Sequence, residues 1–349
     1  MAAPLRIAVT ADPELPVPPH GYGGIERIIH FLVDGLAARG HDVTLIAHRE
    51  SAVACRLVPY PCDEGQSAVA RVRVAATIAR TVYGGAFDVV HSFGRLASLA
   101  PLALHPARKL MSYQRPVTPR SITLARRLFG ASLEFSACSR QMIADVRDLA
   151  TWHVVYNGVR LANFTPVTTL PANAPLAFLG RVEEIKGTHI AIEVARRTGR
   201  PLIIAGNIEA EHQRYFDERV RPHVDGTQVQ FVGTVNDVQK NALLGRCAAF
   251  LMPILWEEPF GIVMAEALAC GTPVIGFRRG SVPEVVDEGV TGFIADTTDD
   301  MVAAVGRLGA IDRLRCREAA EQRFSDQAIV SAYEAVYRGL GQRGGAPRG

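Results

Sequence analysis

Two glutamates, Glu258 and Glu266, lie eight positions apart in the stretch WEEPFGIVMAEALACGTPVIGF. Apolar residues at helical spacing follow Gly261, so we expect a helix to begin there and to end near Cys270. The N-terminus of a helix presents unpaired backbone N–H groups and the positive end of its dipole, which together favour phosphate. Carboxylates on either side would suit a ligand whose hydroxyl groups flank a diphosphate, as in a nucleotide sugar. The alternative is that both acids serve only the helix dipole, at about 0.3–1 kcal/mol each.

Two basic residues, Arg181 and Lys186, directly follow an expected strand at Leu176–Gly180. The order Lys-Gly-Thr that begins at Lys186 differs from the Gly-Lys-Thr of a nucleotide-binding P-loop, so that motif is absent. Two cations fixed at the carboxyl end of a strand would instead neutralise a leaving diphosphate through charge-assisted hydrogen bonds. The alternative is that Arg181 pairs with Glu183 or Glu184 on a solvated surface.

A glycine-rich loop precedes an expected helix near the start of the chain. It contains Gly21, Gly23 and Gly24, and the helix is expected from about Ile25. Glu26 takes the place of the third glycine of a dinucleotide-binding fingerprint, which argues against NAD. The bare backbone at Gly23 and Gly24 still suits a phosphate. The alternative is an ordinary junction between a loop and a helix.

The segment Val89–Leu133 contains basic residues and no acidic residue. It predicts either a solvated positive face or a surface for an anionic acceptor or for a membrane that carries one. His91 lies at an expected strand end, where it either packs or faces a cleft. The basic residues are Arg95, Arg108, Lys109, Arg115, Arg120, Arg126 and Arg127.

The alternation of strands and helices predicts an α/β fold with two doubly wound domains. We expect domains at 1–165 and 166–325, since residues 163–175 are rich in Pro, Thr and Asn. A last helix at 326–340 is expected to cross back to the first domain, and the tail 341–349 is expected to be disordered. Ligands bind such sheets at the carboxyl ends of the strands.

Composition limits the kind of protein. The formal net charge is only +3, which argues against general binding to nucleic acid. The six cysteines form no C-x-x-C pair and no Asp-x-Asp pair occurs, so we expect a reducing, cytoplasmic setting with neither metal nor cofactor. The N-terminus resembles no secretion signal, and no apolar run is long enough to span a bilayer.

Taken together, these motifs resemble the retaining glycosyltransferases of family 4, which have the GT-B fold of two Rossmann-like domains that face each other across a cleft. The likeness covers nearly the whole chain. It is carried by EPFGIVMAEALACGTPVIG, GSVPEVV, GVTGF, LGRVEEIKG and YGGIERIIHFLVDGLAARGHDVTL.

The resemblance implies roles for individual residues. Glu258 would contact hydroxyls of the donor sugar, Glu266 would bind the ribose, and Arg181 with Lys186 would neutralise the diphosphate. Many relatives carry a histidine where this chain has Tyr113-Gln114, so the acceptor side is expected to involve His91, Tyr113 or Arg115. The remaining donor-binding residues implied are Gly23, Gly24, Phe260, Gly261, Ile262 and Val263, with the base near Gly233 and Val235.

The implied activity is metal-independent, retaining transfer of a sugar from a nucleoside-diphosphate sugar to an acceptor hydroxyl. A UDP-sugar is favoured as donor and GDP-mannose comes next, in the synthesis of a bacterial glycan, glycolipid or glycosylated natural product. Front-face attack is expected, with the leaving phosphate as base. The acceptor would be anionic or lipid-linked, with peripheral contact at the inner membrane face. The alternatives are a non-catalytic protein that binds nucleotide sugars, and an epimerase or phosphorylase of the same architecture.

Overall fold

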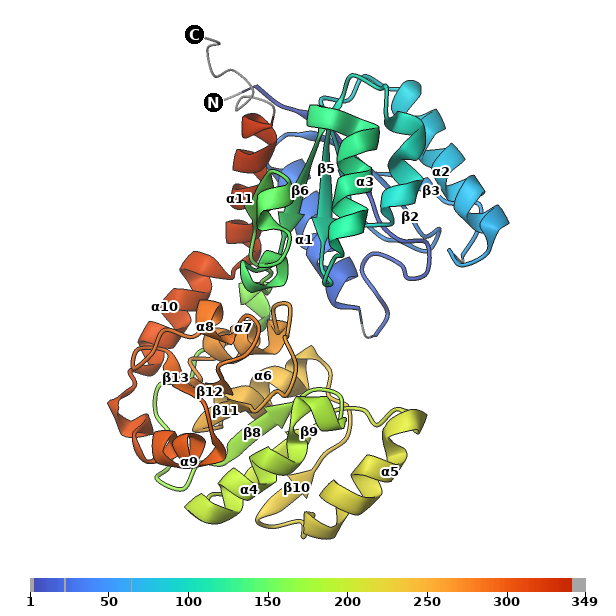
Figure 1. Cartoon of the computed structure of the whole chain (residues 1–349). Helices are drawn as coiled ribbons and strands as arrows, with labels where there is room; N and C mark the ends of the chain where they lie inside the picture. The colour runs from blue at the N-terminus through green and yellow to red at the C-terminus, as the bar shows by residue number, and fades with distance from the viewer. Residues whose placement is uncertain (1–2, 22, 64, 341–349) are drawn as a thin grey trace. The chain divides into compact units, whose positions relative to one another are not determined.

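The computed structural model describes residues 3–21, 23–63 and 65–340 (Figure 1). The chain forms two compact units, one of residues 1–157 and 326–349 and the other of residues 158–325. The predicted disordered tail at 341–349 lies outside the described residues. Among the described residues, no helix combines the length and apolar character that crossing a bilayer requires.

The first unit contains a seven-stranded sheet in the order β3-β2-β1-β4-β5-β6-β7, and every neighbouring pair is parallel. All carboxyl ends therefore lie at one edge, where ligands bind in doubly wound sheets. The strands are β1 (Arg6–Thr10), β2 (Asp42–Ala47), β3 (Arg56–Pro59), β4 (Val89–Ser92), β5 (Arg108–Tyr113), β6 (Leu133–Ala137) and β7 (Trp152–Val154).

Helices cover both faces of this sheet (Figure 1). On one face, α1 (Gly24–Ala38) packs against α11 (Asp326–Gly339), so the end of the chain belongs to the first unit. The other face carries α2 (Ala68–Tyr83), the 3-10 helix η1 (Leu96–Leu102) and α3 (Pro119–Phe129).

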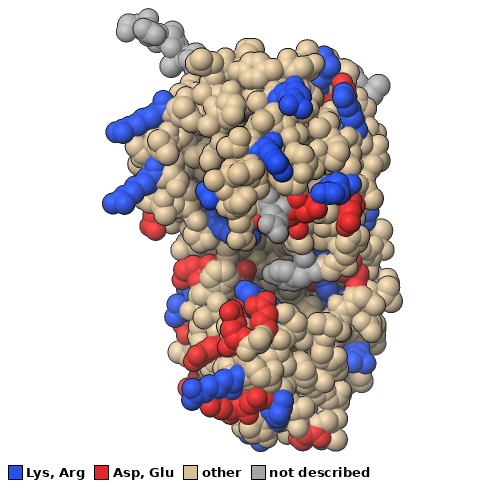
Figure 2. Space-filling view, turned by 90° about the vertical axis from the view of Figure 1, so that its right-hand side faces the viewer, with Lys and Arg blue, Asp and Glu red and all other residues tan. Residues whose placement is uncertain are grey.

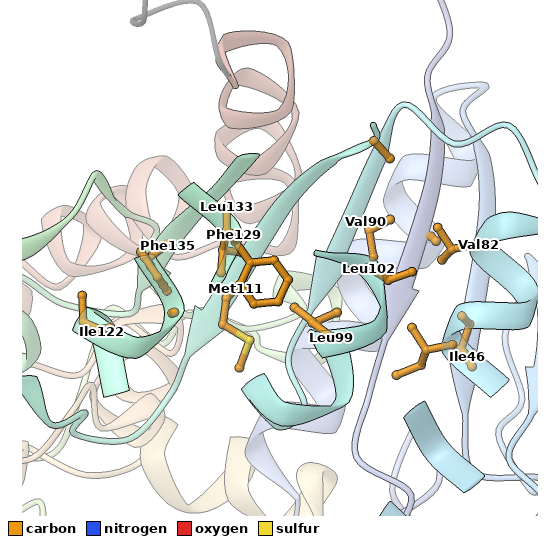
Figure 3. Packing of buried hydrophobic residues seen from close by; sticks show 14 of the residues in the cluster. Ile46, Val82, Val90, Leu99, Leu102, Met111, Ile122, Phe129, Leu133 and Phe135 are labelled. Atoms are coloured by element: carbon orange, nitrogen blue, oxygen red, sulfur yellow. The ribbon is translucent and has the colours of Figure 1, made fainter. Parts of the chain in front are cut away.

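A hydrophobic core lies between the sheet and the second set of helices (Figure 3). The pattern of α2 explains its place there, because its buried residues recur every four positions and so form one stripe. The labelled core residues in Figure 3 are Ile46, Val82, Val90, Leu99, Leu102, Met111, Ile122, Phe129, Leu133 and Phe135.

The second unit contains a six-stranded parallel sheet in the order β10-β9-β8-β11-β12-β13. Its strands are β8 (Leu176–Leu179), β9 (Leu202–Ala205), β10 (Val229–Phe231), β11 (Ala249–Met252), β12 (Val274–Phe277) and β13 (Gly292–Ala295). Its helices are α4 (Thr188–Thr198), α5 (Gln213–Tyr215), α6 (Asp237–Gly245), α7 (Ile262–Ala269), α8 (Val282–Val285), α9 (Thr298–Gly306) and α10 (Arg313–Arg323). The prediction of two doubly wound α/β domains is confirmed.

The two ends of the second unit lie side by side. Val159 forms a parallel bridge with Ser325, and its N–H donates to the carbonyl of Phe324 at 2.8 Å. A Cβ on Gly158 would lie 2.1 Å from that same carbonyl oxygen, so only glycine fits there. The chain therefore enters and leaves this unit through two hydrogen-bonded segments.

Candidate active site

The predicted helix start near Gly261 is present in the second unit. Gly261 has a φ of 70°, in the left-handed region that favours glycine, and α7 begins at the next residue. No side chain caps this N-terminus. Phe260 and Gly261 lead into the helix, and Ile262 and Val263 form the start of its first turn. With no side-chain cap, the N–H groups of Ile262 and Val263 are left for a ligand or solvent.

Glu258 and Lys186 are brought together beside this helix start. The Nζ of Lys186 lies 2.5 Å from Oε2 of Glu258, and the indole N–H of Trp256 donates to the same oxygen at 3.1 Å. The Lys186 Nζ also lies 4.8 Å from the centre of the Trp256 ring, within the range of a cation–π contact. Gly187 allows the approach, since a Cβ there would lie 2.0 Å from the carbonyl oxygen of Pro253. The acid and the cation thus form one half-buried charged group.

Arg181 has different partners. Its Nη2 lies 3.0 Å from Oε1 of Glu183, and its Nη1 lies 3.4 Å from Oε2 of Glu209. Glu183 is buried and also lies 3.2 Å from Nε2 of His212. The alternative interpretation of Arg181 is therefore correct about Glu183 as a partner, although Glu183 is buried rather than solvated. Among the described residues, no ion pair joins Arg181 to Glu258.

Glu266 is buried within α7 and pairs with a lysine that sequence analysis missed. Its Oε1 lies 2.6 Å from Nζ of Lys240, in the first turn of α6. Its Oε2 is buried and has no hydrogen-bond partner among the described residues. A buried acceptor without a partner is costly, so it points to a donor supplied by a ligand. The sequence signal was a capping box at Asn236 and Gln239, which fixes where α6 begins and so places Lys240.

The loops after three neighbouring strands meet at the same edge of the second sheet. The N–H of Gly206, after β9, donates to the carbonyl of Gly233, after β10, at 2.8 Å. A Cβ on Gly206 would lie 1.8 Å from the carbonyl oxygen of Gly180, after β8. Gly233 has a φ of 70°, and Val235 directly precedes the capping residue of α6. Gly233 and Val235 thus lie at the carboxyl edge that also carries Arg181.

In the first unit, Gly23 is the capping residue of α1 and Gly24 is its first helical residue. A Cβ on Gly23 would lie 2.7 Å from Cβ of Pro19 and 2.8 Å from Oε2 of Glu26, so a larger residue would crowd both side chains. Burial raises the pKa of Glu26, and it also raises the pKa of Asp12, at the carboxyl end of β1. Sequence analysis did not identify these two acids as site candidates.

His91 does not face a cleft. The strand β4 extends through Ser92, so His91 pairs within the sheet with Leu110 and is fully buried. Its Nδ1 lies 2.6 Å from the hydroxyl of Tyr337 on α11, and its Nε2 lies 2.6 Å from Oγ of Ser112. Burial lowers the pKa of His91 to about 3. His91 is therefore a neutral core residue, and the interpretation of it as an acceptor contact is not supported by its place in the fold.

The other two acceptor candidates lie at the end of β5. Tyr113 stacks on Phe135, with ring centres 6.2 Å apart, and burial raises its pKa to about 12. Arg115 is exposed. Burial raises the pKa values of Asp12 and Glu26, and the positive charge of Arg115 partly offsets that rise. Arg115 thus lies near the acids at the carboxyl edge of the first sheet.

One group of potential metal ligands occurs among the described residues. It consists of Glu209, Glu211 and His212. Glu209 pairs with Arg181, while His212 pairs with Glu183 and Glu211. These side chains already have ionic partners and therefore give no argument for a metal centre.

Two parallel sheets, each with its own helices, are the architecture of the GT-B glycosyltransferases. The model described as "Glycosyltransferase Family 4" matches residues 22–163, and the model described as "Glycosyl transferases group 1" matches residues 171–323. The chain belongs to glycosyltransferase family 4, and its predicted GT-B fold is confirmed.

Similar proteins cover the chain almost end to end. The glycogen synthase of Mycobacterium tuberculosis is 27% identical over 403 aligned positions, which cover 95% of each chain. A phosphatidyl-myo-inositol mannosyltransferase of Propionibacterium freudenreichii is also 27% identical, with 94% of each chain covered. The crystal structure of AviGT4, a glycosyltransferase involved in avilamycin A biosynthesis, is 27% identical with a TM-score of 0.73, covering 97% of this chain and 98% of the other. The protein is accordingly a glycosyltransferase.

Proposed function

We propose that the protein transfers a sugar from a nucleoside-diphosphate sugar to an acceptor hydroxyl, with retention of the anomeric configuration and without a metal ion. The observation that carries this proposal is the Lys186–Glu258 pair beside the uncapped N-terminus of α7. It combines a cation, a carboxylate and free backbone N–H groups at the carboxyl edge of the second sheet.

The diphosphate is the group that these cations would stabilise. Negative charge builds up on it as the bond to the sugar breaks, and fixed positive groups lower the energy of that state. Lys186 would exchange its contact with Glu258 for a phosphate oxygen, and Arg181 would supply a second cation. The backbone of Phe260, Gly261, Ile262 and Val263 would contribute N–H groups and the helix dipole. Gly23 and Gly24 are assigned to the donor phosphates on the same physical grounds.

Glu258 and Glu266 would then bind donor hydroxyls. Release of Lys186 would leave Glu258 with the Trp256 indole and free to accept from the sugar. The unpartnered Oε2 of Glu266 would accept from the ribose, while Lys240 holds the other oxygen. The base is assigned to the neighbourhood of Gly233 and Val235.

The retaining outcome is proposed to follow front-face attack. Glu258 shares its charge with Lys186 and Trp256, which suits hydrogen bonding to a sugar better than nucleophilic attack. The acceptor hydroxyl would form its bond to the anomeric carbon as the bond to the phosphate breaks, and its proton would pass to the leaving phosphate oxygen.

The acceptor is proposed to be an anionic or lipid-linked hydroxyl compound that binds at the first unit, near Tyr113 and Arg115. The equal identity to a glycogen synthase and to a phosphatidyl-myo-inositol mannosyltransferase does not choose between acceptors. We propose a role in the synthesis of a bacterial glycan, glycolipid or glycosylated natural product at the cytoplasmic face of the inner membrane.

A donor panel tests the proposed activity. Purified protein is incubated with UDP-sugars first, GDP-mannose second and ADP-sugars third, together with candidate acceptors, and nucleoside diphosphate release and product configuration are measured. A product with the donor's anomeric configuration supports the proposal. Donor binding without turnover would indicate a non-catalytic binding protein, and interconversion of free nucleotide sugars or a need for inorganic phosphate would indicate an epimerase or a phosphorylase.

A further inference from the structure

Two helices of the first unit expose a surface in which basic and aliphatic side chains alternate. We call it the α2–α3 surface, after the two helices that share one face of the first sheet. It consists of Val69, Val72, Arg73, Arg80, Arg120, Leu124, Arg127 and Leu128.

The helix α3 contributes the surface by helical geometry. It buries Ile122, Ala125 and Phe129 on one stripe against the core. At 100° per residue, Arg120, Leu124 and Arg127 fall on the opposite side. The structure leaves Leu124 63% exposed, although burying such a side chain would be worth about 1.5–3 kcal/mol. The outer stripe is thus both cationic and apolar.

The helix α2 repeats this arrangement. Its buried stripe ends at Val82, and the opposite side carries Val69, Val72, Arg73 and Arg80. Val69 is 61% exposed and Val72 is 68% exposed. Because α2 and α3 cover the same face of the sheet, their outward stripes belong to one side of the first unit.

Acidic residues are nearly absent from this part of the chain. Residues 65–133 contain ten Lys and Arg residues and a single acid, Asp88. Asp88 precedes β4 and accepts the backbone N–H of Arg6 at 2.8 Å, so it lies at the amino edge of the sheet. Figure 2 faces the α2 side of the first unit and shows Lys and Arg spread over largely uncharged surface, with Asp and Glu toward its margins.

The structure also corrects the sequence-based interpretation of the basic segment Val89–Leu133. Lys109 is fully buried and donates to the carbonyls of His105 and Ala107 at 2.7 and 2.9 Å. Arg108 lies at the amino edge of the sheet, where β5 begins. Lys109 and Arg108 therefore do not belong to the α2–α3 surface. Its basic residues are the arginines of α3 together with those of α2, which lies outside the segment Val89–Leu133.

We propose that the α2–α3 surface binds the anionic headgroups of a phospholipid bilayer, with its aliphatic side chains entering the boundary between headgroups and acyl chains. Basic residues near an anionic membrane each contribute roughly fivefold to partitioning, and exposed aliphatic side chains between them add apolar insertion. A nucleic acid would use the arginines but leave the aliphatic side chains without a partner, since bases stack on aromatic rings. This proposal deepens the acceptor part of the proposed function, because a lipid-linked acceptor would be reached from such a surface.

Sedimentation with vesicles tests the proposal. Full-length protein is mixed with vesicles of phosphatidylcholine alone or of phosphatidylcholine with phosphatidylglycerol. We expect binding only to the anionic vesicles, and weakening as ionic strength rises because salt screens exposed charges. Substituting four arginines, R73Q/R80Q/R120Q/R127Q, should reduce partitioning by several hundred-fold at roughly fivefold per residue. The variant L124S/L128S should reduce it at least tenfold while leaving the charge unchanged.

Matched controls lie on the second unit. R214Q/R315Q removes two exposed arginines, and V238S/L314S removes two exposed aliphatic side chains, so partitioning should change less than twofold in each. Thermal unfolding of each variant checks that the fold is intact. Equal loss in surface and control variants, or binding to duplex DNA but not to anionic vesicles, would overturn the proposal.

Catalysis is measured separately, as transfer to an acceptor in detergent without vesicles. Loss of vesicle binding with transfer intact shows that the surface serves the membrane and leaves the proposed function standing. Absence of transfer with vesicle binding intact contradicts the proposed function and not the surface.

Discussion

Lys240 and Glu266 form an ion pair within the second unit in which only one of the two carboxylate oxygens has a partner. Nζ of Lys240 lies 2.6 Å from Oε1, and Oε2 is buried without a hydrogen-bond partner among the described residues. The lysine therefore fixes the direction of the second oxygen. On the proposed function, this arrangement would position Glu266 for a hydroxyl of the donor, and Lys240 would act as a positioning residue.

Replacing Lys240 by methionine should weaken donor binding. Removing one partner of a buried charged pair costs about 2–5 kcal/mol, which corresponds to roughly 30-fold to several-thousand-fold. We expect this cost to appear mainly as a higher KM for the donor, because Glu266 is assigned to the ribose and not to the reacting bond. Steady-state kinetics of K240M measure this split. Partial recovery in K240R is expected, and a loss confined to kcat would contradict a positioning role.

Replacing Lys186 by alanine should reduce kcat/KM by a similar factor while the fold survives. The variant lacks the contact that Lys186 makes with Glu258 in the free protein. On the proposed function, it also lacks the contact with the departing diphosphate. E258Q offers a comparison, because it removes the charge of the partner but keeps the amide near Trp256. Initial rates with saturating acceptor test both variants. Near-normal turnover in K186A would remove the proposed diphosphate site.

The sequence predicted where α7 begins, because that signal is local. Glu258 and Glu266 are joined by one helix start that Pro, Gly and the apolar spacing make visible. Lys240 escaped notice because it reaches Glu266 from another helix. The order of the strands in the sheet decides which helix lies beside α7, and local sequence patterns do not encode that order.

Of the two interpretations of His91, the structure bears out a packed side chain and not one that faces a cleft. The sequence could not choose between them for a related reason. Apolar residues identified β4, but the strand continues through two polar residues that look like a loop. They are polar because each has a buried polar partner. His91 contacts the hydroxyl of Tyr337 on α11, 246 positions later in the chain, and Ser92 accepts a hydrogen bond from the hydroxyl of Thr10. Only tertiary structure shows the contact with Tyr337. By contrast, β8, a strand of buried apolar residues, was predicted to within one residue of its observed end.

Chelation should leave activity unchanged. Lys186 and Arg181 would supply the positive charge that a divalent ion supplies elsewhere. We expect the same transfer rate in protein treated with EDTA and in protein supplied with magnesium or manganese, with a metal-dependent glycosyltransferase assayed in parallel as the control. Strict dependence on added metal would contradict the proposed roles of these cations.

Replacing Gly158 by alanine should destabilise the second unit. A Cβ at this position would meet the carbonyl oxygen of Phe324, so the backbone would have to move and the hydrogen bond from Val159 would weaken. We expect a loss of about 1–3 kcal/mol, visible as a lower Tm. G306A is the control, because a Cβ there meets nothing within 4 Å and alanine favours a helix. Equal Tm values for both variants would show that the two segments joined at Val159 and Phe324 can move apart without loss of stability.

His91 predicts a pH dependence of stability in the first unit. Its pKa is lowered to about 3 by burial, whereas the unfolded chain titrates near the ordinary value of about 6.5. Above about pH 6.5 neither state binds the proton and the group has no effect. As the pH falls below that value the unfolded state takes up the proton first, so stability is lost progressively, by about 2 kcal/mol at about pH 5.

The variant H91Q should remove this dependence although it is less stable at neutral pH. Thermal unfolding between about pH 7.5 and about pH 5 should therefore show a smaller fall in Tm for H91Q than for the unaltered protein. Y337F is the matched variant, because it removes the hydroxyl that contacts Nδ1 and leaves the imidazole buried. It should be less stable throughout but keep the steeper pH dependence. Parallel curves for the unaltered protein and H91Q would mean that His91 becomes protonated in the folded state, which the closed packing around its ring under α11 opposes.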